Sequence, residues 1–186
     1  MDKEKAEQAI RDLLQAMDID DRKHPDLEST PKRVIKMLQE VWEGERYSNR
    51  EIANMFGKTF PANSNGMVVV KDIHAFSYCE HHLALMYNMH IHVGYIPNDK
   101  VIGLSKISRI ADMCCKRLQL QERITKDILE VMQYIVGKNV IVYIEAEHSC
   151  VTARGIKKDS AKTVTIEKSG VFNNPENYNQ FMQMIK

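Results

Sequence analysis

The spacing of apolar residues changes part-way along this chain, and the change limits the folds that the chain can adopt. In the first part, apolar residues recur at steps of three and four, which predicts helices over 3–17, 30–44 and 49–55. Near Met67 the step drops to two. Over 85–95, apolar residues alternate with polar ones, which predicts a half-buried strand that pairs with its neighbour as a hairpin. A helical segment therefore precedes a sheet.

Beyond the hairpin, the helical and the strand spacing each return. Helices are expected over 107–118 and 124–135, strands over 139–147 and 161–167, and a last helix from Asn174. The order of two strands, two helices and two strands predicts an α+β fold with a mainly antiparallel sheet and helices on one face. We expect residues 1–60 to form an N-terminal helical appendage with a charged linker at 18–29, and residues 61–186 to form one structural unit.

Charge and hydropathy exclude several classes of partner. The 26 Lys and Arg residues nearly cancel the 25 Asp and Glu residues, so no overall field draws the chain to nucleic acid or to an anionic membrane. The first ten residues are too polar for a signal-peptide core. The longest apolar runs, 67–70 and 140–144, are far shorter than the about 18 residues of a membrane span. We expect a soluble, cytoplasmic protein without a nucleic-acid or membrane partner.

The four cysteines are too few for a disulfide framework. In a reducing compartment the remaining roles are core packing, metal binding and catalysis. Cys114 and Cys115 fall on the apolar stripe of an expected helix, and adjacent cysteines do not readily bridge each other, so packing is favoured for them. Cys79 and Cys150 have histidines as neighbours and therefore require a separate interpretation.

Five of the seven histidines fall within residues 74–92, around Cys79. Cys79 and His82 have the C-x-x-H spacing with which a tight turn aims a thiolate and an imidazole at one metal ion. At the end of an expected strand, the two-residue period places His148 and Cys150 on one face. Two thiolates and one imidazole suit Zn²⁺, and three protein ligands leave a position open for water, which is typical of a catalytic site.

The alternative is that Cys79 and Cys150 are small buried hydrophobic residues without a metal. Spacing alone also leaves open which of the neighbouring histidines are ligands. His90 and His92 alternate with the apolar face of their strand, so we expect them to be solvent-exposed rather than ligands. His24 lies in the charged linker and has no predicted role.

Two groups of basic residues are candidates for holding a phosphate chain. Lys106 and Arg109 stand three residues apart at an expected helix start, where backbone N–H groups and the helix dipole favour anions. Residues 154–158 add positive charge close to the proposed metal, and their glycine lets the backbone approach a ligand. The alternative for Lys106 and Arg109 is an ordinary solvated helix face. Residues 121–123 have the pattern of an ordinary helix start.

Four motifs together resemble the GTP cyclohydrolase I family. They are CEHH at 79–82, GLSKI-x-R at 103–109, QERIT at 121–125, and H-x-C at 148–150 followed by ARG at 153–155. The resemblance runs from residue 30 to about residue 165, with the motifs in the family's order. It implies the tunnelling fold, in which β-β-α-α-β-β subunits join their sheets edge to edge into an oligomeric barrel, usually a homodecamer of two pentamers.

The resemblance also assigns roles to individual residues. It implies Cys79, His82 and Cys150 as zinc ligands, and His81 and His148 as unligated acid–base groups. The substrate-binding residues that it implies are Gln121 and Glu122 for guanine, Ser105 near the ribose, and Lys106, Arg109, Arg154 and Arg33 for the triphosphate. Arginine suits phosphate because its planar group can make two parallel hydrogen bonds.

The reaction that the resemblance implies converts GTP and water into 7,8-dihydroneopterin triphosphate and formate, the first step of tetrahydrofolate and pterin biosynthesis. Hydration of the guanine C8 requires an activated water and a proton donor to N7, for which His81 is the expected group. His148 is expected to move protons during the later ribose opening and rearrangement. Two alternatives are a relative that acts on another nucleotide and a zinc-stabilised nucleotide-binding protein without turnover.

Overall fold

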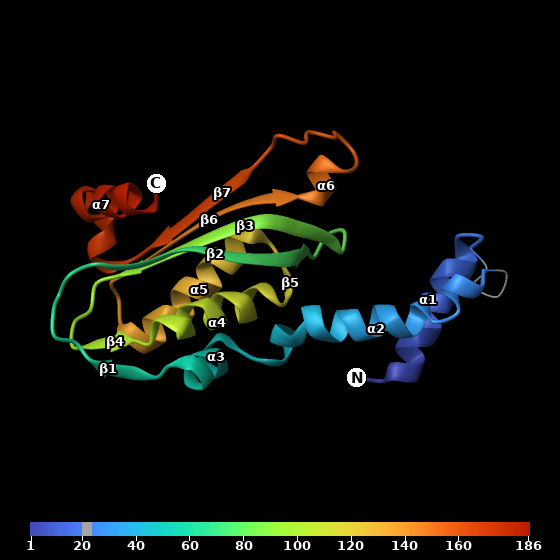
Figure 1. Ribbon diagram of the computed structural model, residues 1–186, viewed down its shortest axis with the longest axis horizontal. Coiled ribbons are helices and arrows are strands. Elements are labelled where there is room, and N and C mark those ends of the chain that lie inside the picture. The colour runs from blue at the N-terminus through green and yellow to red at the C-terminus, as the bar shows by residue number, and fades with distance from the viewer. Residues whose placement is uncertain (20–23) are drawn as a thin grey trace. The chain divides into compact units, whose positions relative to one another are not determined.

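The computed structural model describes residues 1–19 and 24–186. The chain forms two compact units, Met1–Glu43 and Gly44–Lys186 (Figure 1). The charged linker expected at 18–29 includes residues 20–23, which lie outside the described residues. The expected division into an appendage over 1–60 and a catalytic domain over 61–186 stays a prediction.

In the described residues of the first unit there are two helices and a short 3-10 turn: α1 (Lys3–Ala16), η1 (Pro25–Leu27) and α2 (Thr30–Val41). The Asp2 carboxylate caps α1 by accepting a hydrogen bond from the backbone N–H of Lys5. Pro31 stands in the first turn of α2, where its missing N–H costs no helical hydrogen bond. The two helices pack against each other and confirm the helical spacing of this segment.

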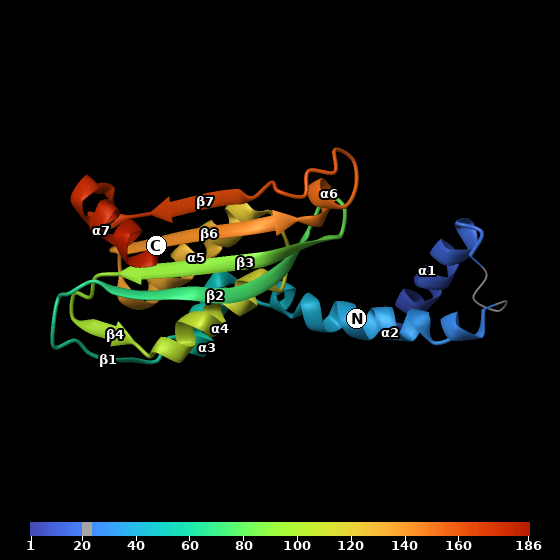
Figure 2. The same ribbon diagram turned by 45° about the horizontal axis from the view of Figure 1, so that its top comes forward.

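A five-stranded sheet forms the centre of the second unit (Figure 2). In spatial order its strands are β5 (Leu118–Gln119), β2 (Val68–Cys79), β3 (Ala84–Tyr95), β6 (Val140–His148) and β7 (Thr163–Lys168). Neighbouring strands run antiparallel, except that β5 pairs in parallel with β2. The expected hairpin of β2 and β3 is confirmed, and the short β5 makes the sheet mixed rather than purely antiparallel.

Helices α4 (Leu104–Cys115) and α5 (Gln121–Val136) cover one face of this sheet, and α3 (Asn49–Phe56) packs against both (Figures 1 and 2). Helix α7 (Pro175–Ile185) packs on the opposite face. The remaining elements are η2 (Glu43–Arg46), β1 (Thr59–Pro61), β4 (Lys100–Ile102), α6 (Ser149–Thr152) and η3 (Gly170–Asn173). The α+β architecture with two helices on one face is thereby confirmed. Within the described ranges, no helix has the length and apolar character needed to cross a membrane.

The main core lies between the sheet and helices α4 and α5. Cys114 and Cys115 belong to it and are fully buried or nearly so, which confirms their packing role. Burial raises the pKa of the Cys114 thiol to about 12, so this side chain stays un-ionised. Gly137 ends α5 with a φ of 90°, a conformation that favours glycine. At its other end, α5 begins directly after the two-residue strand β5.

The short strands were not expected from the sequence. Strands β1 and β4 pair over three residues each, and β5 contains only Leu118 and Gln119. Segments this short contain too few residues to show a two-residue period. Residue 118 was expected to close a helix, but the helix ends at Cys115 and the chain then extends beside β2.

Candidate active site and metal group

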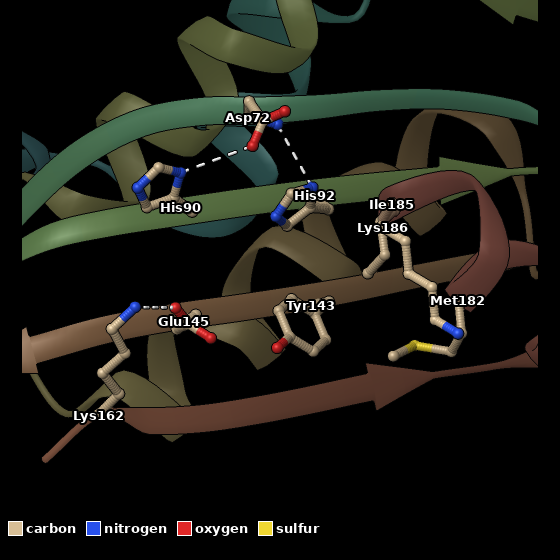
Figure 3. Close-up of a pocket in the computed structure, with 9 residues that line it drawn as sticks. All are labelled: Asp72, His90, His92, Tyr143, Glu145, Lys162, Met182, Ile185 and Lys186. Atoms are coloured by element: carbon tan, nitrogen blue, oxygen red, sulfur yellow. Dashed lines mark hydrogen bonds and ion pairs between the residues drawn. The ribbon is translucent and has the colours of Figure 1, made fainter.

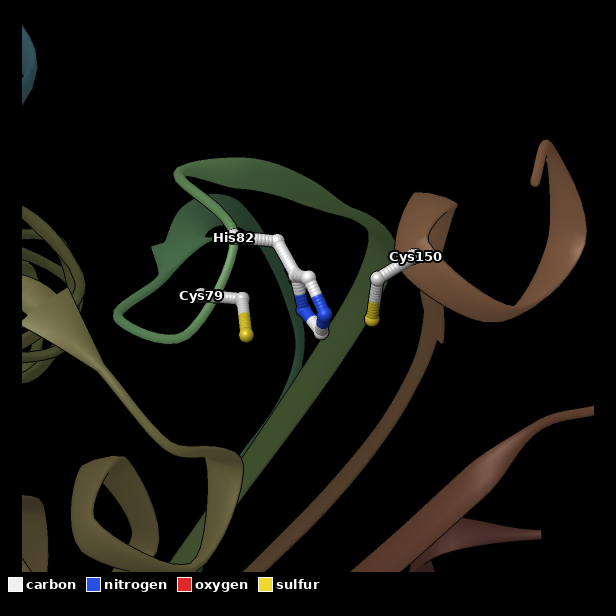
Figure 4. Close-up of side chains that lie close together, drawn as sticks. All are labelled: Cys79, His82 and Cys150. Carbon is white, nitrogen blue, oxygen red and sulfur yellow. The ribbon is translucent and has the colours of Figure 1, made fainter. Parts of the chain in front are cut away.

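The turn that joins β2 to β3 brings Cys79 and His82 together (Figure 4). Cys79 is the last residue of β2 and is 5% exposed. Residues 80–83 then reverse the chain, and Leu83 adopts a φ of 50°, which is uncommon for a residue with a side chain. The two side chains meet in the way that a C-x-x-H spacing on a tight turn predicts.

Cys150 approaches the same point from the neighbouring segment. Strand β6 ends at His148, and residues Ser149–Thr152 form the helical turn α6. The two-residue strand period that was expected to align His148 with Cys150 is therefore wrong here. The hydroxyl of Ser149 donates a hydrogen bond to the carbonyl oxygen of Leu85 at 2.8 Å, which fastens the start of α6 to β3. A helical turn thus carries Cys150 to the other two side chains (Figure 4).

The ligand atoms of Cys79, His82 and Cys150 all lie within 4.8 Å of one another. We call these three residues the metal group. No second group of three potential metal ligands comes this close among the residues that the structure describes. Burial, and then the neighbouring Cys79 thiol, raise the pKa of the Cys150 thiol. A cation between the sulfurs would reverse this, because a coordinating thiol loses its proton. Two sulfur donors and one nitrogen donor fit a zinc ion and leave the fourth tetrahedral position without a protein ligand.

His148 hydrogen-bonds the buried side chain of Gln121, with 2.8 Å between Nε2 and Oε1. The Gln121 amide nitrogen donates to the carbonyl oxygens of Ile144 and Thr163 at 3.1 and 3.0 Å, and to the hydroxyl of Thr165 at 3.2 Å. Because these acceptors orient the amide, its oxygen faces His148 and accepts the Nε2–H. In the neutral ring, Nδ1 then keeps its lone pair.

Burial lowers the pKa of His148, while the nearby Glu122 carboxylate acts in the opposite direction. The neutral imidazole is therefore favoured at pH 7. Glu122 is exposed in the first turn of α5, so a ligand can reach its carboxylate. His81 is also exposed, and its ring centre lies 6.3 Å from that of His82. The structure thus brings His148 next to Glu122, and His81 next to an expected ligand.

Two of the arginines expected to bind triphosphate, Arg154 and Arg33, lie in different units. Nη1 of Arg154 lies 3.2 Å from Nε2 of His82, so the chain itself brings this guanidinium to the metal group. Arg33 is exposed on α2 of the first unit, where its backbone N–H donates to Ser29. Arg154 is therefore placed at the metal group by the fold of its own unit, and the role of Arg33 stays a prediction.

The second basic group occupies the first turns of α4, directly after β4 (Figure 1). It consists of Ser105, Lys106 and Arg109. The other end of α4 lies beside the metal group, because the carbonyl oxygen of Cys115 accepts a hydrogen bond from Ser77, two residues before Cys79, at 2.7 Å. At about 1.5 Å of rise per residue, roughly 15 Å of helix separates the two ends. Within one chain, the second basic group therefore does not join Arg154.

Polar side chains also gather on the sheet face opposite α4 and α5 (Figure 3). A pocket of about 380 Å³ there is lined by Asp72, His90, His92, Tyr143, Glu145, Lys162, Met182, Ile185 and Lys186. The expectation that His92 is exposed is wrong, because the side chain packs edge to face on Tyr143 and is only 6% exposed. Its Nδ1 accepts the backbone N–H of Asp72 at 3.3 Å.

Sequence reasoning did not single out Asp72, although its carboxylate lies 3.5 Å from the half-exposed His90. The pairing of β2 with β3 shifts register between Val70 and Ile73, and Asp72 has a φ of 56°. This irregularity turns Asp72 toward the two histidines (Figure 3). Simple alternation along the strand therefore cannot find it.

Comparison with known proteins decides the family. The profile of a family described as GTP cyclohydrolase I matches residues 6–186. The chain belongs to this family. A GTP cyclohydrolase 1 of Clostridium botulinum (strain Kyoto / Type A2) is 55% identical over 174 residues, which are 90% of this chain and 88% of the relative. The resemblance inferred from the four motifs is thereby confirmed, and the enzyme class is that of GTP cyclohydrolase I.

Two further relatives match at similar identity. A GTP cyclohydrolase 1 of Clostridium acetobutylicum is 51% identical over 182 residues, covering 95% of this chain and 93% of the relative. One of Ruminiclostridium cellulolyticum is 50% identical over 195 aligned positions, covering 100% of this chain and 98% of the relative. The similarity therefore extends over both compact units, and the α+β sheet with its helices is consistent with the fold of the GTP cyclohydrolase I family.

Proposed function

We propose that the chain is a zinc-dependent GTP cyclohydrolase I that converts GTP and water into 7,8-dihydroneopterin triphosphate and formate. The observation that carries this proposal is the convergence of Cys79, His82 and Cys150 in a member of the family. Three protein ligands are typical of catalytic zinc, whereas structural zinc has four. The proposed product would enter tetrahydrofolate and pterin biosynthesis, and the proposed location is the cytoplasm.

In this proposal Cys79, His82 and Cys150 hold the zinc ion. When bound, zinc supplies Lewis-acid chemistry and lowers the pKa of a water toward about 7. Arg154 lies 3.2 Å from His82 and would attract the negative charge of a nucleotide to this place.

His148 would take up and return a proton at Nδ1. Gln121 holds the Nε2–H, and burial lowers the pKa of the ring, so the imidazole is unprotonated at neutral pH as a base must be. His81 is exposed on the turn and is the proposed proton donor to N7 of guanine. The proposed division of roles is supported by the half-buried, hydrogen-bonded state of His148 and the exposed state of His81.

Glu122 and Gln121 are the proposed guanine-recognising pair, Glu122 by direct contact with the base and Gln121 indirectly. The exposed carboxylate of Glu122 can accept hydrogen bonds from the N–H groups of the ring. Gln121 is 1% exposed, and its side chain already accepts a hydrogen bond from His148 and donates to three acceptors. Gln121 would therefore contribute through the position of His148 rather than by direct side-chain contact with the base.

We assign the ribose and triphosphate to Ser105, Lys106, Arg109, Arg154 and Arg33. Because the first turns of α4 lie at the opposite end from the metal group, we propose that a neighbouring subunit supplies that part of the site. Strands β5 and β7 are the two edges of the sheet, and an edge offers backbone groups for pairing with another copy. Edge pairing would build the barrel of a homodecamer of two pentamers.

Incubation of the purified, zinc-loaded chain with GTP tests the proposal. The expected result is release of formate together with the absorbance of a reduced pterin. Inosine triphosphate is the matched control, because it lacks the 2-amino group that Glu122 would recognise, and it should react more slowly. GTP binding without formate release would favour the nucleotide-binding protein without turnover. Turnover of another nucleotide in place of GTP would favour the altered relative.

A further inference from the structure

The turn between β2 and β3 carries a charged side chain that has no part in the proposed chemistry. The carboxylate of Glu80 receives two hydrogen bonds from the guanidinium of Arg123, at 2.6 and 3.1 Å. Two parallel bonds fix the relative orientation of both groups more firmly than one bond does. Glu80 directly follows Cys79 and stands two residues before His82, so its position affects both.

The backbone of Glu80 is tied to the same segment as its side chain. The Glu80 N–H donates to the carbonyl oxygen of Gln119 at 3.1 Å. Cys79 is the register partner of Gln119 where β2 meets β5. Glu80 is therefore attached to β5 by its main chain and to the first turn of α5 by its side chain. Both attachments belong to residues 119–123, which include the proposed guanine-recognising pair.

A buried network of hydrogen bonds holds the segment 119–123 at Gln119. The Gln119 amide nitrogen donates to the Asp127 carboxylate at 2.8 Å and to the carbonyl oxygen of Cys114 at 3.3 Å. Asp127 also pairs with Arg117 at 2.8 Å, and both of these side chains are only 12% exposed. A buried network of this kind keeps one arrangement, because opening it would leave a charge without a partner away from water. The segment is thus a fixed point for the turn.

The rest of the turn is exposed to solvent. His81, His82 and Leu83 are all exposed, and Leu83 has the unfavourable φ of 50°. An exposed turn gains little from burial, so its conformation depends on the attachments at its ends. Figure 4 shows the ring of His82 between the two cysteine side chains, a position that requires a defined path of the turn.

We propose that Arg123 is a positioning residue for the metal group: by holding Glu80, it fixes the turn that presents His82 to Cys79 and Cys150. The inference rests on the proposed function only in taking these three residues as zinc ligands. Arg123 acts through Glu80 and has no assigned contact with zinc or substrate.

An ordinary surface ion pair would behave differently. The side chains of Arg123 and Glu80 are 46% and 31% exposed, and pairs this exposed contribute little to global stability. Loss of an ordinary pair would change neither the thermal midpoint nor the zinc affinity. Loss of a positioning pair would weaken zinc binding while the midpoint of the metal-free chain hardly moves. Measuring both the zinc affinity and the thermal midpoint of the metal-free chain therefore distinguishes a positioning pair from an ordinary surface ion pair.

The experiment compares zinc dissociation constants of the full chain and its variants, measured by competition with a chromophoric zinc chelator. Arg123→Ala and Glu80→Gln should each weaken zinc about tenfold, the lower end of what a lost supporting contact costs. The zinc dissociation constant of Arg123→Lys should lie between those of the parent chain and Arg123→Ala, because an ammonium cannot reproduce the two parallel bonds. The double variant Glu80→Gln/Arg123→Ala should bind zinc no more weakly than Arg123→Ala, because both changes remove the same ion pair.

Lys162→Ala is the matched control. Lys162 pairs with Glu145 at 2.7 Å, and the two side chains are 55% and 31% exposed. The zinc affinity of Lys162→Ala should equal that of the parent chain. Circular dichroism and the midpoint of the metal-free protein check folding, and Glu80→Gln keeps the shape of the side chain should Arg123→Ala fail to fold.

Zinc dissociation constants of Arg123→Ala and Glu80→Gln within twofold of the parent value would overturn the inference. A parent chain that binds no zinc would overturn it together with the ligand assignment. A parent chain that binds zinc tightly but releases no formate from GTP would overturn the proposed reaction alone. The two proposals therefore fail in distinguishable ways.

Discussion

Each cysteine of the metal group stands at a point where a strand ends. Cys79 closes β2 before a tight turn, and Cys150 lies in a helical turn that begins directly after β6. A regular strand would keep such side chains in line along one face, so convergence from two strands requires the backbone to leave the sheet. The site therefore depends on local conformation as much as on the identity of the ligands.

Cys150→Ser and His82→Ala should lose zinc and activity together, since two remaining ligands hold the ion too weakly. Zinc content of the purified variants, measured by atomic emission beside turnover of GTP, checks this. His24→Ala, an exposed histidine in the first unit, is the control and should keep about one zinc per chain. Full zinc content in either ligand variant would remove that residue from the metal group.

His148→Ala should keep its zinc yet lose about a hundredfold or more in turnover, the usual scale for a missing acid–base group. The reason is that His148 hydrogen-bonds Gln121 and is not itself one of the three converging donors. His90→Ala, on the opposite sheet face, is the matched control and should turn over GTP at the parental rate. Parental turnover in His148→Ala would return this histidine to a structural role.

At the scale of elements, the two faces of the sheet pack against different helices. One face builds the main core with α4 and α5, while α7 packs on the other through a smaller cluster that contains Ile141, Phe172 and Phe181. Gly94 of β3 lies under α7, where the absence of a side chain lets Phe181 approach the strand. The packing of α7 therefore depends in part on the close approach of Phe181 to Gly94.

Gly94→Ala should therefore destabilise the chain by about 1–3 kcal/mol, the usual cost of forcing extra volume into a packed contact. A Cβ at this position would stand 2.7 and 2.9 Å from ring carbons of Phe181 and 3.0 Å from a methyl of Ile141. Urea unfolding measures the change. Gly66→Ala is the control, because its Cβ would meet nothing closer than 3.6 Å. Equal midpoints for the two variants would contradict the packing described for α7.

The pocket face should also make stability depend on pH. Burial is the main cause that lowers the pKa of His92; Asp72 and Glu145 oppose it, and His90 and Lys71 reinforce it. Below a pH of about 6.5, the histidine in the unfolded chain therefore binds a proton, while His92 in the folded chain stays unprotonated until the pH reaches its lower pKa. The free energy of unfolding should fall as the pH drops below about 6.5, until the lower folded pKa is passed.

His92→Gln should flatten this dependence. Urea unfolding at a series of pH values from 7 to 5 measures the slope, and the variant should lose less stability over that range than the parent chain. An unchanged slope in His92→Gln would assign the acid sensitivity to other groups.

The sequence predicted long elements well and short ones poorly, for a physical reason. The apolar stripe of α5 extends over four turns, so its period and its closing Gly137 are both visible. The turn α6 has four residues and β5 has two, and neither contains a full period. Cys150 was therefore expected at a strand end although it lies in a helical turn, and the bulge at Asp72 concealed the pocket face.

On the scale of the whole molecule, the two parts of the proposed nucleotide site lie at opposite ends of one helix. The carboxyl end of α4 adjoins the metal group through Ser77, and its amino end carries Lys106 about 15 Å away. A single GTP held at the guanine-recognising pair of one chain would therefore take its second set of phosphate contacts from another chain. The enzyme should accordingly be active only as an oligomer.

Complementation between inactive variants tests this arrangement. Cys150→Ser removes a proposed zinc ligand, and Lys106→Glu repels the phosphates, so each should be inactive alone. In a closed ring built from equal amounts of the two chains, each site has an even chance of an intact metal group and an even chance of an intact Lys106 from its neighbour. Co-refolding should therefore restore about one site in four. If both residues served the site of their own chain, every chain would carry one defect and mixing would restore nothing. Full-size oligomers by gel filtration that contain both chains yet stay inactive would reject the shared site and leave the zinc assignment untouched.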